Sequence, residues 1–258
     1  MKNLHLFFLL PLIAVMACTA TQRTGKDTIP AVELRTEFDK TWIDDGHTER
    51  IKTAMYIYQT GDFMIYKEVV ALEEYEGTLD PDPESDKIYF TLTRDSSVYR
   101  FWVYNMAEQK GIVFGHFDTI PPRPFALDTF LQKKGLIFPR LINPENDSLL
   151  ERTAYKDGRV IRRHTPRVKY DNSYNATLTL YYERPQGLYP FSFSPEQDTL
   201  RNRKLVKFEI LFHAYRDTLY GLDVPERHFA SQLIPIKNPD TAEINRMTAA
   251  FRANRHLL

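Results

Sequence analysis

Apolar and polar residues alternate in short runs over most of the chain. In the run 205–215 the apolar positions are Val206, Phe208, Ile210 and Phe212, and Lys207, Glu209 and His213 lie among them. A period of two directs one side of a strand into the core and the other side into water. This run therefore predicts a strand that is buried on one side only.

Runs of the same kind, rich in β-branched and aromatic residues, predict about ten short strands. The predicted hairpins are 55–59 with 63–71 around Gly61-Asp62, 87–93 with 98–104 around the turn 94–97, and 151–155 with 159–165 around Asp157-Gly158. Further strands are predicted at 111–117, 176–182 and 228–236. Because hairpins join antiparallel strands, the sheet should be mainly antiparallel.

Three segments instead carry apolar residues at helical spacing. The segment 31–43 has Leu34, Phe38 and Trp42, the segment 125–134 has Leu127, Phe130 and Leu131, and the segment 241–254 has Ile244, Met247, Thr248 and Phe251. Asp240 and Glu243 have the spacing of a capping box at the start of the third segment. The sequence therefore predicts one helix near each end and one in the middle.

These elements indicate an α+β fold that is mainly antiparallel β, arranged as a curved sheet, an open barrel or paired sheets. It has an N-terminal helix, a short central helix and a C-terminal helix. We expect a single β-rich globular domain over 30–258, with a sub-boundary near the prolines of 121–124 as the alternative to one continuous sheet. The segment 79–86 has two prolines among four carboxylates, which favours a solvated loop over a calcium site.

The amino-acid composition limits which binding partners and metal sites the chain can have. Among the 258 residues, 34 Lys and Arg balance 34 Asp and Glu, and the sequence pI is about 7.1. Nucleic-acid binding needs a concentrated positive field, so this balance argues against a nucleic-acid partner. The single cysteine, Cys18, excludes a disulfide framework and a thiolate zinc site. We expect no cofactor and no metal.

The first eighteen residues combine a positive charge, an apolar run and the cysteine. Lys2 precedes the apolar run 6–15, and polar residues follow Cys18. A membrane-spanning helix needs about 20 apolar residues. This shorter run therefore predicts a secretory signal peptide over 1–17.

The residues Val15-Met16-Ala17-Cys18 resemble the lipobox of bacterial lipoproteins. The resemblance implies that the Cys18 thiol carries diacylglycerol and that the new amino group is also acylated, for example with palmitate. Each buried CH₂ contributes about 0.8 kcal/mol, so two or three chains form a stable membrane anchor. The segment 18–29 is then a flexible lipidated tether. Thr19 stands where enteric lipoproteins retained at the inner membrane have Asp, which favours the outer membrane with the domain facing the periplasm. An ordinary secreted protein is the alternative.

Asp followed by Ser or Thr occurs eight times in the chain, against about two expected from composition. Five of these pairs precede Ile or Leu and place a hydroxyl at Thr28, Thr119, Ser148, Thr199 and Thr218. This pattern resembles the O-glycosylation signal of exported proteins in the Bacteroides group. Asp, Ser and Thr are also the usual turn and N-cap residues, so both interpretations stay open.

No motif of a common enzyme class is present. The chain lacks G-x-S-x-G, H-E-x-x-H, P-loop and G-x-G-x-x-G patterns. His116 lies near Asp118, and His213 lies near Glu209, on predicted strands where acid–base pairs could form. Such pairs on exposed strand faces are more often solvated cross-strand partners, so no catalytic residue is assigned.

The densest basic segment is 159–169, with the cations Arg159, Arg162, Arg163, Arg167 and Lys169 around His164. It is a candidate patch for an anionic partner such as a lipid headgroup or an acidic protein. The alternative is a charged edge strand that resists aggregation. The aromatic segments 181–182 and 188–193 are able either to stack on glycans or to fill a β-rich core.

The leading hypothesis is a non-enzymatic, lipid-anchored lipoprotein of the periplasm or outer membrane. It would act as a binding or structural module for an envelope protein, a glycan or a lipid. One alternative is a LolA-like carrier of a lipid or another apolar ligand, and a second is a cryptic hydrolase with a His–carboxylate site. A large apolar cavity would favour the carrier, a concave His–carboxylate site the hydrolase, and a packed core with an exposed patch the binding module.

Overall fold

The structure is a computed structural model. It describes residues 29–41, 48–79, 88–115, 121–138, 147–166, 176–184, 189–217 and 221–258. The predicted signal peptide, Cys18 and nearly all of the predicted tether lie outside these ranges. Most of the predicted acidic loop 79–86 also lies outside them.

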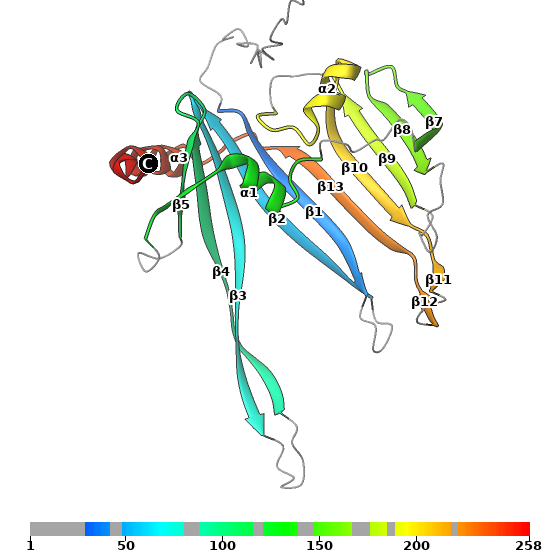
Figure 1. Cartoon of the computed structure of the whole chain (residues 1–258), viewed down its shortest axis with the longest axis horizontal. Coiled ribbons are helices and arrows are strands. Elements are labelled where there is room, and N and C mark those ends of the chain that lie inside the picture. The colour runs from blue at the N-terminus through cyan, green and yellow to red at the C-terminus, as the bar shows by residue number, and fades with distance from the viewer. Residues whose placement is uncertain are drawn as a thin grey trace, which may run out of the picture.

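Eleven strands form one antiparallel sheet that is not closed on itself (Figure 1). From one edge to the other, the order is β6-β5-β4-β3-β2-β1-β13-β10-β9-β8-β7. The strands are β1 Ala31–Thr41, β2 Thr48–Thr60, β3 Phe63–Leu79, β4 Ile88–Asn105, β5 Lys110–Phe114, β6 Arg123–Phe125, β7 Asp147–Ala154, β8 Val160–Pro166, β9 Ala176–Glu183, β10 Lys204–Phe212 and β13 Arg227–Pro235. A separate ribbon pairs β11 Tyr215–Asp217 with β12 Leu222–Val224. The prediction of a mainly antiparallel β fold is confirmed, as one open sheet.

Strand β13 joins the two halves of this sheet. It lies between β1, the first strand of the meander β1–β6, and β10, the last strand of the meander β7–β10. Its register places Leu233 opposite Leu34 and Ser231 opposite Phe208. Strands from both sides of the prolines at 121–124 therefore belong to the same sheet.

The predicted N-terminal helix over 31–43 is wrong, because residues Ala31–Thr41 form strand β1. Leu34 and Phe38 are separated by an even number of positions, so they also share one side of a strand. Ladders to β2 on one side and β13 on the other use the backbone groups of β1 on both edges. Sheet pairing between distant segments thus overrides the local helical spacing.

The predicted turn at 94–97 is also wrong. These residues lie inside β4, which pairs with β3 along the whole length of both strands. A register shift between Glu74 and Tyr75 interrupts the ladder beside this stretch. Such a bulge accommodates one extra residue without ending the strand. The predicted hairpin is therefore a single long strand, and β3 and β4 extend beyond the other strands as a ribbon (Figure 1).

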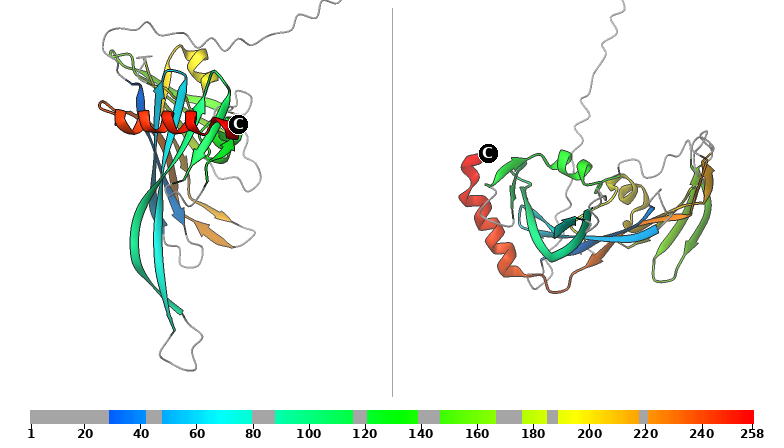
Figure 2. Two further views of the ribbon diagram at one scale, coloured as in Figure 1. Left: turned by 90° about the vertical axis from the view of Figure 1, so that its left-hand side faces the viewer. Right: turned by 90° about the horizontal axis from the view of Figure 1, so that it is seen from below.

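Three α-helices lie on the two sides of the curved sheet. α1 Leu127–Lys133 and α2 Pro195–Arg201 lie on the concave side, and α3 Thr241–Ala253 lies on the outer side (Figure 2). A short 3₁₀ helix, Arg255–Leu257, follows α3. The predicted cap of α3 is confirmed, because Asp240 accepts a hydrogen bond of 3.0 Å from the backbone N–H of Glu243. Sequence reasoning missed α2.

Two apolar cores lie on opposite faces of the sheet. The concave core contains Val32, Leu34, Met55, Ile57, Met64, Tyr66, Phe130, Leu131, Leu136, Val160, Leu180, Tyr182, Phe191, Phe193, Leu205, Phe208 and Leu233. The outer core contains Ala31, Tyr58, Phe63, Ile65, Phe101, Val103, Ile112, Phe114, Ile244, Met247 and Phe251. The strands at the centre of the sheet contribute alternate residues to the two cores, as the period of two requires.

Helix α3 is fixed to the outer face by a buried ion pair as well as by its apolar side. Lys67 on β3 contacts Glu243 at 2.9 Å, and both side chains are about 15% exposed or less. The Lys67 ammonium also lies 4.0 Å from the centre of the Tyr99 ring. Removing one partner would leave a charge without its counter-ion, so this pair makes the position of α3 specific.

Candidate functional site

The concave face of the sheet is lined by aromatic side chains, and α1 covers part of it. Phe130 of α1 stacks on Trp102 with ring centres 4.4 Å apart, and its ring centre lies 5.1 Å from that of Tyr66. Phe125 packs edge-on against Trp102 at 5.2 Å. Aromatic pairs in these geometries stabilise by about 0.5–1.5 kcal/mol beyond the area they bury. Helix α1 therefore covers the sheet through apolar contacts, and the geometry of the ring pairs fixes how it packs.

Helix α1 has few polar connections to the strands that it covers. It has seven residues, and its N-cap, Ala126, makes no side-chain cap bond. In the described ranges, no backbone hydrogen bond joins residues 127–137 to the sheet. An ion pair between Lys134 and Glu68 ties the end of the helix to β3. Isolated helices shorter than about 12 residues are marginal in water, so α1 depends on Phe130 and Leu131 for its position.

Two further segments fill the concave face beside α1. The backbone N–H of Phe138 donates a hydrogen bond of 2.9 Å to the carbonyl of Phe193. Both rings pack edge-on against Phe208 of β10, with centres 4.8 and 5.2 Å away. Phe208 is fully buried. The aromatic segment 188–193, one of the glycan-stacking candidates, thus places Phe191 and Phe193 in the concave core.

The basic segment 159–169 does not form one continuous patch. Arg162 and Arg163 are neighbours on β8, so their side chains point to opposite faces of the sheet. Arg163 is paired with Glu151 at 3.2 Å, and Arg159 is paired with Asp157 at 2.7 Å. Arg167 and Lys169, the other two candidates, lie outside the described residues. The segment therefore leaves Arg162 as its unpaired cation among the residues that are described.

Arg162 belongs to a cluster of polar side chains on the concave face, between β7, β8, β9 and α2. We define the arginine cluster as Arg152, Arg162, His164, Tyr182 and Arg201, which ladder pairing or electrostatic interaction brings together. Arg152 lies directly opposite Arg162 in the ladder, and Tyr182 and His164 are on the same face. No ion pair to Arg152, Arg162 or Arg201 occurs in the described part of the chain. Like charges directly opposite each other destabilise a sheet.

Buried polar atoms without a partner gather in the same cluster. They are Arg162 Nε, both ring nitrogens of His164 and Tyr182 Oη. His164 is 4% exposed and Tyr182 is 1% exposed. An unpartnered buried polar atom costs about 1–3 kcal/mol. A group of them in one place therefore calls for a physical explanation.

Three groups of the cluster, His164, Arg162 and Tyr182, have shifted pKa values. Burial lowers the pKa of His164, and Arg162 and Arg201 lower it further, while Asp147 of β7 acts in the opposite direction. Burial also lowers the pKa of Arg162, with Arg201 and Arg152 contributing. Burial raises the pKa of Tyr182 to about 12, against the effects of Arg201 and Arg162. His164 is therefore neutral at pH 7, and the cluster carries an excess of positive charge.

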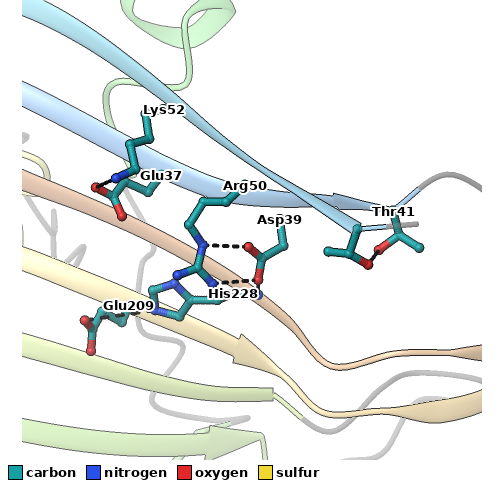
Figure 3. Close-up of polar contacts among 8 residues, drawn as sticks. Glu37, Asp39, Thr41, Arg50, Lys52, Glu209 and His228 are labelled. Atoms are coloured by element: carbon teal, nitrogen blue, oxygen red, sulfur yellow. Dashed lines mark hydrogen bonds and ion pairs between the residues drawn. The ribbon is translucent and has the colours of Figure 1, made fainter. Parts of the chain in front are cut away.

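The outer face carries charged residues that pair across neighbouring strands (Figure 3). Arg50 of β2 donates to Asp39 of β1 at 2.8 and 3.2 Å, and the backbone N–H of His228 donates to the same carboxylate at 2.8 Å. The hydrogen bond from Arg50 lowers the pKa of Asp39. On β10, burial raises the pKa of Glu209, but hydrogen bonds from Lys207 and Tyr181 lower it by more. These satisfied pairs stabilise the register of the sheet.

A pocket of about 310 Å³ opens on the outer face. Its lining includes Tyr155, Arg159, Tyr181, Glu183, Lys207 and Gln232. The Lys207 ammonium lies 5.1 Å from the centre of the Tyr181 ring, and Tyr181 donates a hydrogen bond of 2.5 Å to Glu209. Val160, Ile161, Tyr182 and Val206 also line this pocket. Ligand pockets for drug-sized molecules enclose about 300–1,000 Å³ and are mostly apolar, so this pocket, at the lower end of that range, is a weaker candidate than the concave face.

His213 lies between a hydroxyl and a carboxylate, as the hydrolase hypothesis requires. Its Nε2 is 3.0 Å from Thr177 Oγ1, and its Nδ1 is 3.6 Å from Glu226. The side chains of His213 and Glu226 are 41% and 57% exposed, and His213 lines neither of the two pockets described. A catalytic triad needs enclosure and oxyanion donors. His116, the other candidate, lies outside the described residues.

Two of the five glycosylation candidates fall on described residues. Ser148 is in edge strand β7, opposite Thr165. Thr199 is exposed on α2 and donates a hydrogen bond of 2.9 Å to the carbonyl of Pro195. Thr28, Thr119 and Thr218 lie outside the described residues. Glycosylation stays a prediction at all five.

The chain matches no protein-family model, and no curated protein is significantly similar to it. Among the described helices, none is long and apolar enough to cross a membrane. Within the same ranges, no three His, Cys, Asp or Glu side chains are grouped as metal ligands would be. The candidate site therefore rests on geometry, and it comprises the concave core, its cover α1 and the adjoining arginine cluster.

Sequence reasoning missed most of this site. Arg162, His164 and, as part of the aromatic segment 181–182, Tyr182 were singled out from the sequence, but Arg201 was not. The alternation along 160–164 carried a usable signal, because Val160, Arg162 and His164 must share one face of a strand. Arg201 is on α2, which was not predicted, so no local pattern connected it with β8.

Proposed function

We propose that the chain is a lipid-anchored protein of the cell envelope that binds an apolar ligand on the concave face of its sheet. The observation that carries the proposal is the cover. An aromatic surface on β3, β4 and β6 lies beneath a seven-residue helix that has no backbone hydrogen bond to the sheet among the described residues. The lipid anchor rests on the lipobox-like residues 15–18.

Burial of an acyl chain releases enough free energy to offset the displacement of α1. Moving Phe130 and Leu131 from the core into water costs about 3–6 kcal/mol, at 1.5–3 kcal/mol for each side chain. A ligand gains about 0.8 kcal/mol for each CH₂ that it buries. About eight buried CH₂ groups therefore offset the loss of the cover. A ligand with a chain of ten or more carbons is the class that fits.

The concave site is compatible with two of the hypotheses, a binding module and a carrier. The packed concave core supports the binding module. A short cover that is held mainly by Phe130, Leu131 and the Lys134–Glu68 ion pair supports the carrier, which must release its ligand. The hydrolase has less support, because the Thr177–His213–Glu226 arrangement is exposed to solvent. We therefore propose an apolar-ligand binding protein, with carriage of that ligand as the second candidate.

Phe130→Ala should strengthen the binding of an apolar fluorescent probe such as N-phenylnaphthylamine by about tenfold. Apparent affinity is reduced by the fraction of protein in the open state, and a weaker cover raises that fraction. Phe130 is 4% exposed, so its loss removes most of the packing of α1. Probe fluorescence titration of the purified protein measures the change.

Phe251→Ala is the matched control. Phe251 is 1% exposed and packs against Phe63 under α3 on the outer face. Both variants lose one buried phenyl ring, so both lose stability to a similar degree. Probe affinity should change less than about twofold in Phe251→Ala, because the concave face stays covered. Equal gains in both variants would contradict the proposal.

Cys18→Ala should abolish incorporation of radioactive palmitate when the protein is produced in a bacterium that acylates lipoproteins. The thiol is the group that accepts the lipid in proteins with a lipobox, and Cys18 is the single cysteine of the chain. Gel fluorography of immunoprecipitated protein measures the label. Palmitate label that persists in Cys18→Ala would show that the proposed lipid anchor at Cys18 is wrong. That result would not affect the proposed ligand site on the concave face.

A further inference from the structure

The arginine cluster combines three features that the fold alone does not need. Arg152 and Arg162 face each other on β7 and β8, so two like charges are paired in the ladder. Arg201 of α2 acts on Arg162, His164 and Tyr182 as a third cation. Buried donors with no partner lie among them. Each feature costs stability in the absence of a ligand.

The carboxylates near the cluster do not neutralise it. Asp198 of α2 is already engaged, because it accepts hydrogen bonds from Ser192 at 2.7 Å, Lys204 at 2.9 Å and the backbone N–H of Leu205 at 2.7 Å. Asp147 acts on His164 from the start of β7. Among the described residues, Asp147 and Asp198 are the carboxylates that act on the cluster, and Asp198 is shared with Lys204. Three guanidinium groups therefore leave this described part of the cluster cationic at pH 7, where arginine is always charged.

The unpartnered atoms are mainly donors, and they suit an oxyanion. The guanidinium of Arg162 keeps an Nε–H without an acceptor, and neutral His164 supplies one N–H. The Tyr182 hydroxyl is also without an acceptor, and its oxygen lies close enough to Arg201 for hydrogen bonding to lower its pKa. Arginine binds phosphate through two parallel N–H···O bonds, and bonds to charged groups are about twice as strong as neutral ones. A tetrahedral phosphate has the oxygens to engage several of these donors together.

We propose that the arginine cluster binds a phosphate group, with Arg162 and Arg201 as its principal ligands and His164 and Tyr182 as further donors. The phosphate belongs either to a soluble phosphate ester or to a phospholipid headgroup. Val160, Leu180 and Tyr182 of the concave core are on the same face as Arg162. A phospholipid headgroup bound at the cluster would therefore place its acyl chains beside the apolar surface. Only this phospholipid alternative rests on the proposed function.

The test is isothermal titration calorimetry of the purified protein at constant ionic strength. The probes are inorganic phosphate, glycerol 3-phosphate and dihexanoyl phosphatidylglycerol below its micelle concentration. Arg162→Gln and Arg201→Gln should each weaken binding by about tenfold or more, the effect of one charge-assisted hydrogen bond. Arg163→Gln removes the same charge from the next position of β8, on the opposite face, and should change affinity by less than about twofold.

The probes separate the two sources. Similar affinities for all three probes assign the site to soluble phosphates, and binding of the lipid alone assigns it to a headgroup. No binding of any probe, or an equal loss in Arg163→Gln, overturns the proposal. Phosphate binding with no binding of N-phenylnaphthylamine would retain the cluster and reject the apolar-ligand function.

Stability without ligand separates a binding role from a structural one. Arg162→Gln removes a half-buried cation that faces Arg152, so the midpoint of thermal unfolding in phosphate-free buffer should stay the same or rise. Added phosphate should raise that midpoint in the unaltered protein and in Arg163→Gln, but not in Arg162→Gln. A lower midpoint in Arg162→Gln without phosphate would show that Arg162 serves the fold, and would overturn the proposal.

Discussion

Replacing Phe208 with alanine is expected to lower the free energy of unfolding by about 3–5 kcal/mol, the usual cost of removing a buried phenyl ring. Phe208 is 0% exposed and lies at the centre of an aromatic group on the concave face. The ring centres of Phe138, Phe193 and Phe229 are 4.8, 5.2 and 5.8 Å from its own. Loss of the ring leaves a cavity that three separate segments would have to move to fill.

Urea unfolding followed by tyrosine and tryptophan fluorescence measures this change. Leu200→Ala is the control, because Leu200 is 63% exposed on α2 and should alter stability by no more than about 0.5 kcal/mol. A loss below about 1 kcal/mol in Phe208→Ala would mean that the concave face is loosely packed. The segments 134–138 and 189–194 would then be part of a mobile cover together with α1.

Asp198→Ala is expected to cost about 3–5 kcal/mol, because it leaves a buried cation without its partner. The Asp198 carboxylate binds Lys204 at 2.9 Å, and these side chains are 18% and 14% exposed. Burial lowers the pKa of Lys204, and Asp198 acts in the opposite direction, so the pair keeps the ammonium charged. The same carboxylate also accepts the backbone N–H of Leu205 and holds α2 against β10.

The control for Asp198→Ala is Asp223→Ala. Asp223 pairs with Arg216 at 3.3 Å, but these side chains are 80% and 67% exposed, so the loss should stay within about 1 kcal/mol. Guanidinium unfolding of both variants makes the comparison. Equal small losses would show that α2 is held by apolar contacts alone. In that case Arg201 would not have a fixed position beside β8.

Hairpins whose connecting turns have a typical turn sequence were predictable. Gly61 with Asp62, and Asp157 with Gly158, each join two strands that the structure confirms as hairpins. Gly61 and Gly158 have positive φ angles of 54° and 89°, which glycine adopts without strain. Local turn chemistry therefore fixed these pairings, since no distant contact was needed to specify them.

Elements that depend on distant partners were predicted poorly. Strand β1 was taken for a helix because the i, i+4 spacing of its apolar residues also satisfies a period of two. The turn predicted at 94–97 fails because β3 supplies an uninterrupted partner for β4. The position of β13 between β1 and β10 joins the beginning and the end of the chain, and no local pattern encodes such a pairing.

The candidate site has the same dependence on distant contacts. Its apolar part was predictable only as a general concave core. The basic segment 159–169 was a candidate patch for an anionic partner, with a charged edge strand as the alternative, but the period of two places Arg162 and Arg163 on opposite faces. The two cations that lie near Arg162, Arg152 and Arg201, come from β7 and α2. The structure was therefore needed to distinguish a paired surface arginine from an unpaired one beside the core.

We propose the concave face as the place where an apolar ligand binds, and photo-crosslinking at Tyr104 and Tyr99 is the most direct measurement of that binding. Both belong to β4, but Tyr104 packs against the concave core and Tyr99 lies against Lys67 on the outer face. Benzoylphenylalanine at either position keeps an aromatic ring there. After irradiation of the native cell envelope, mass spectrometry should find adducts that contain an acyl chain at Tyr104 and none at Tyr99. Adducts at Tyr99 alone, equal adducts at both positions, or none at either would contradict the account.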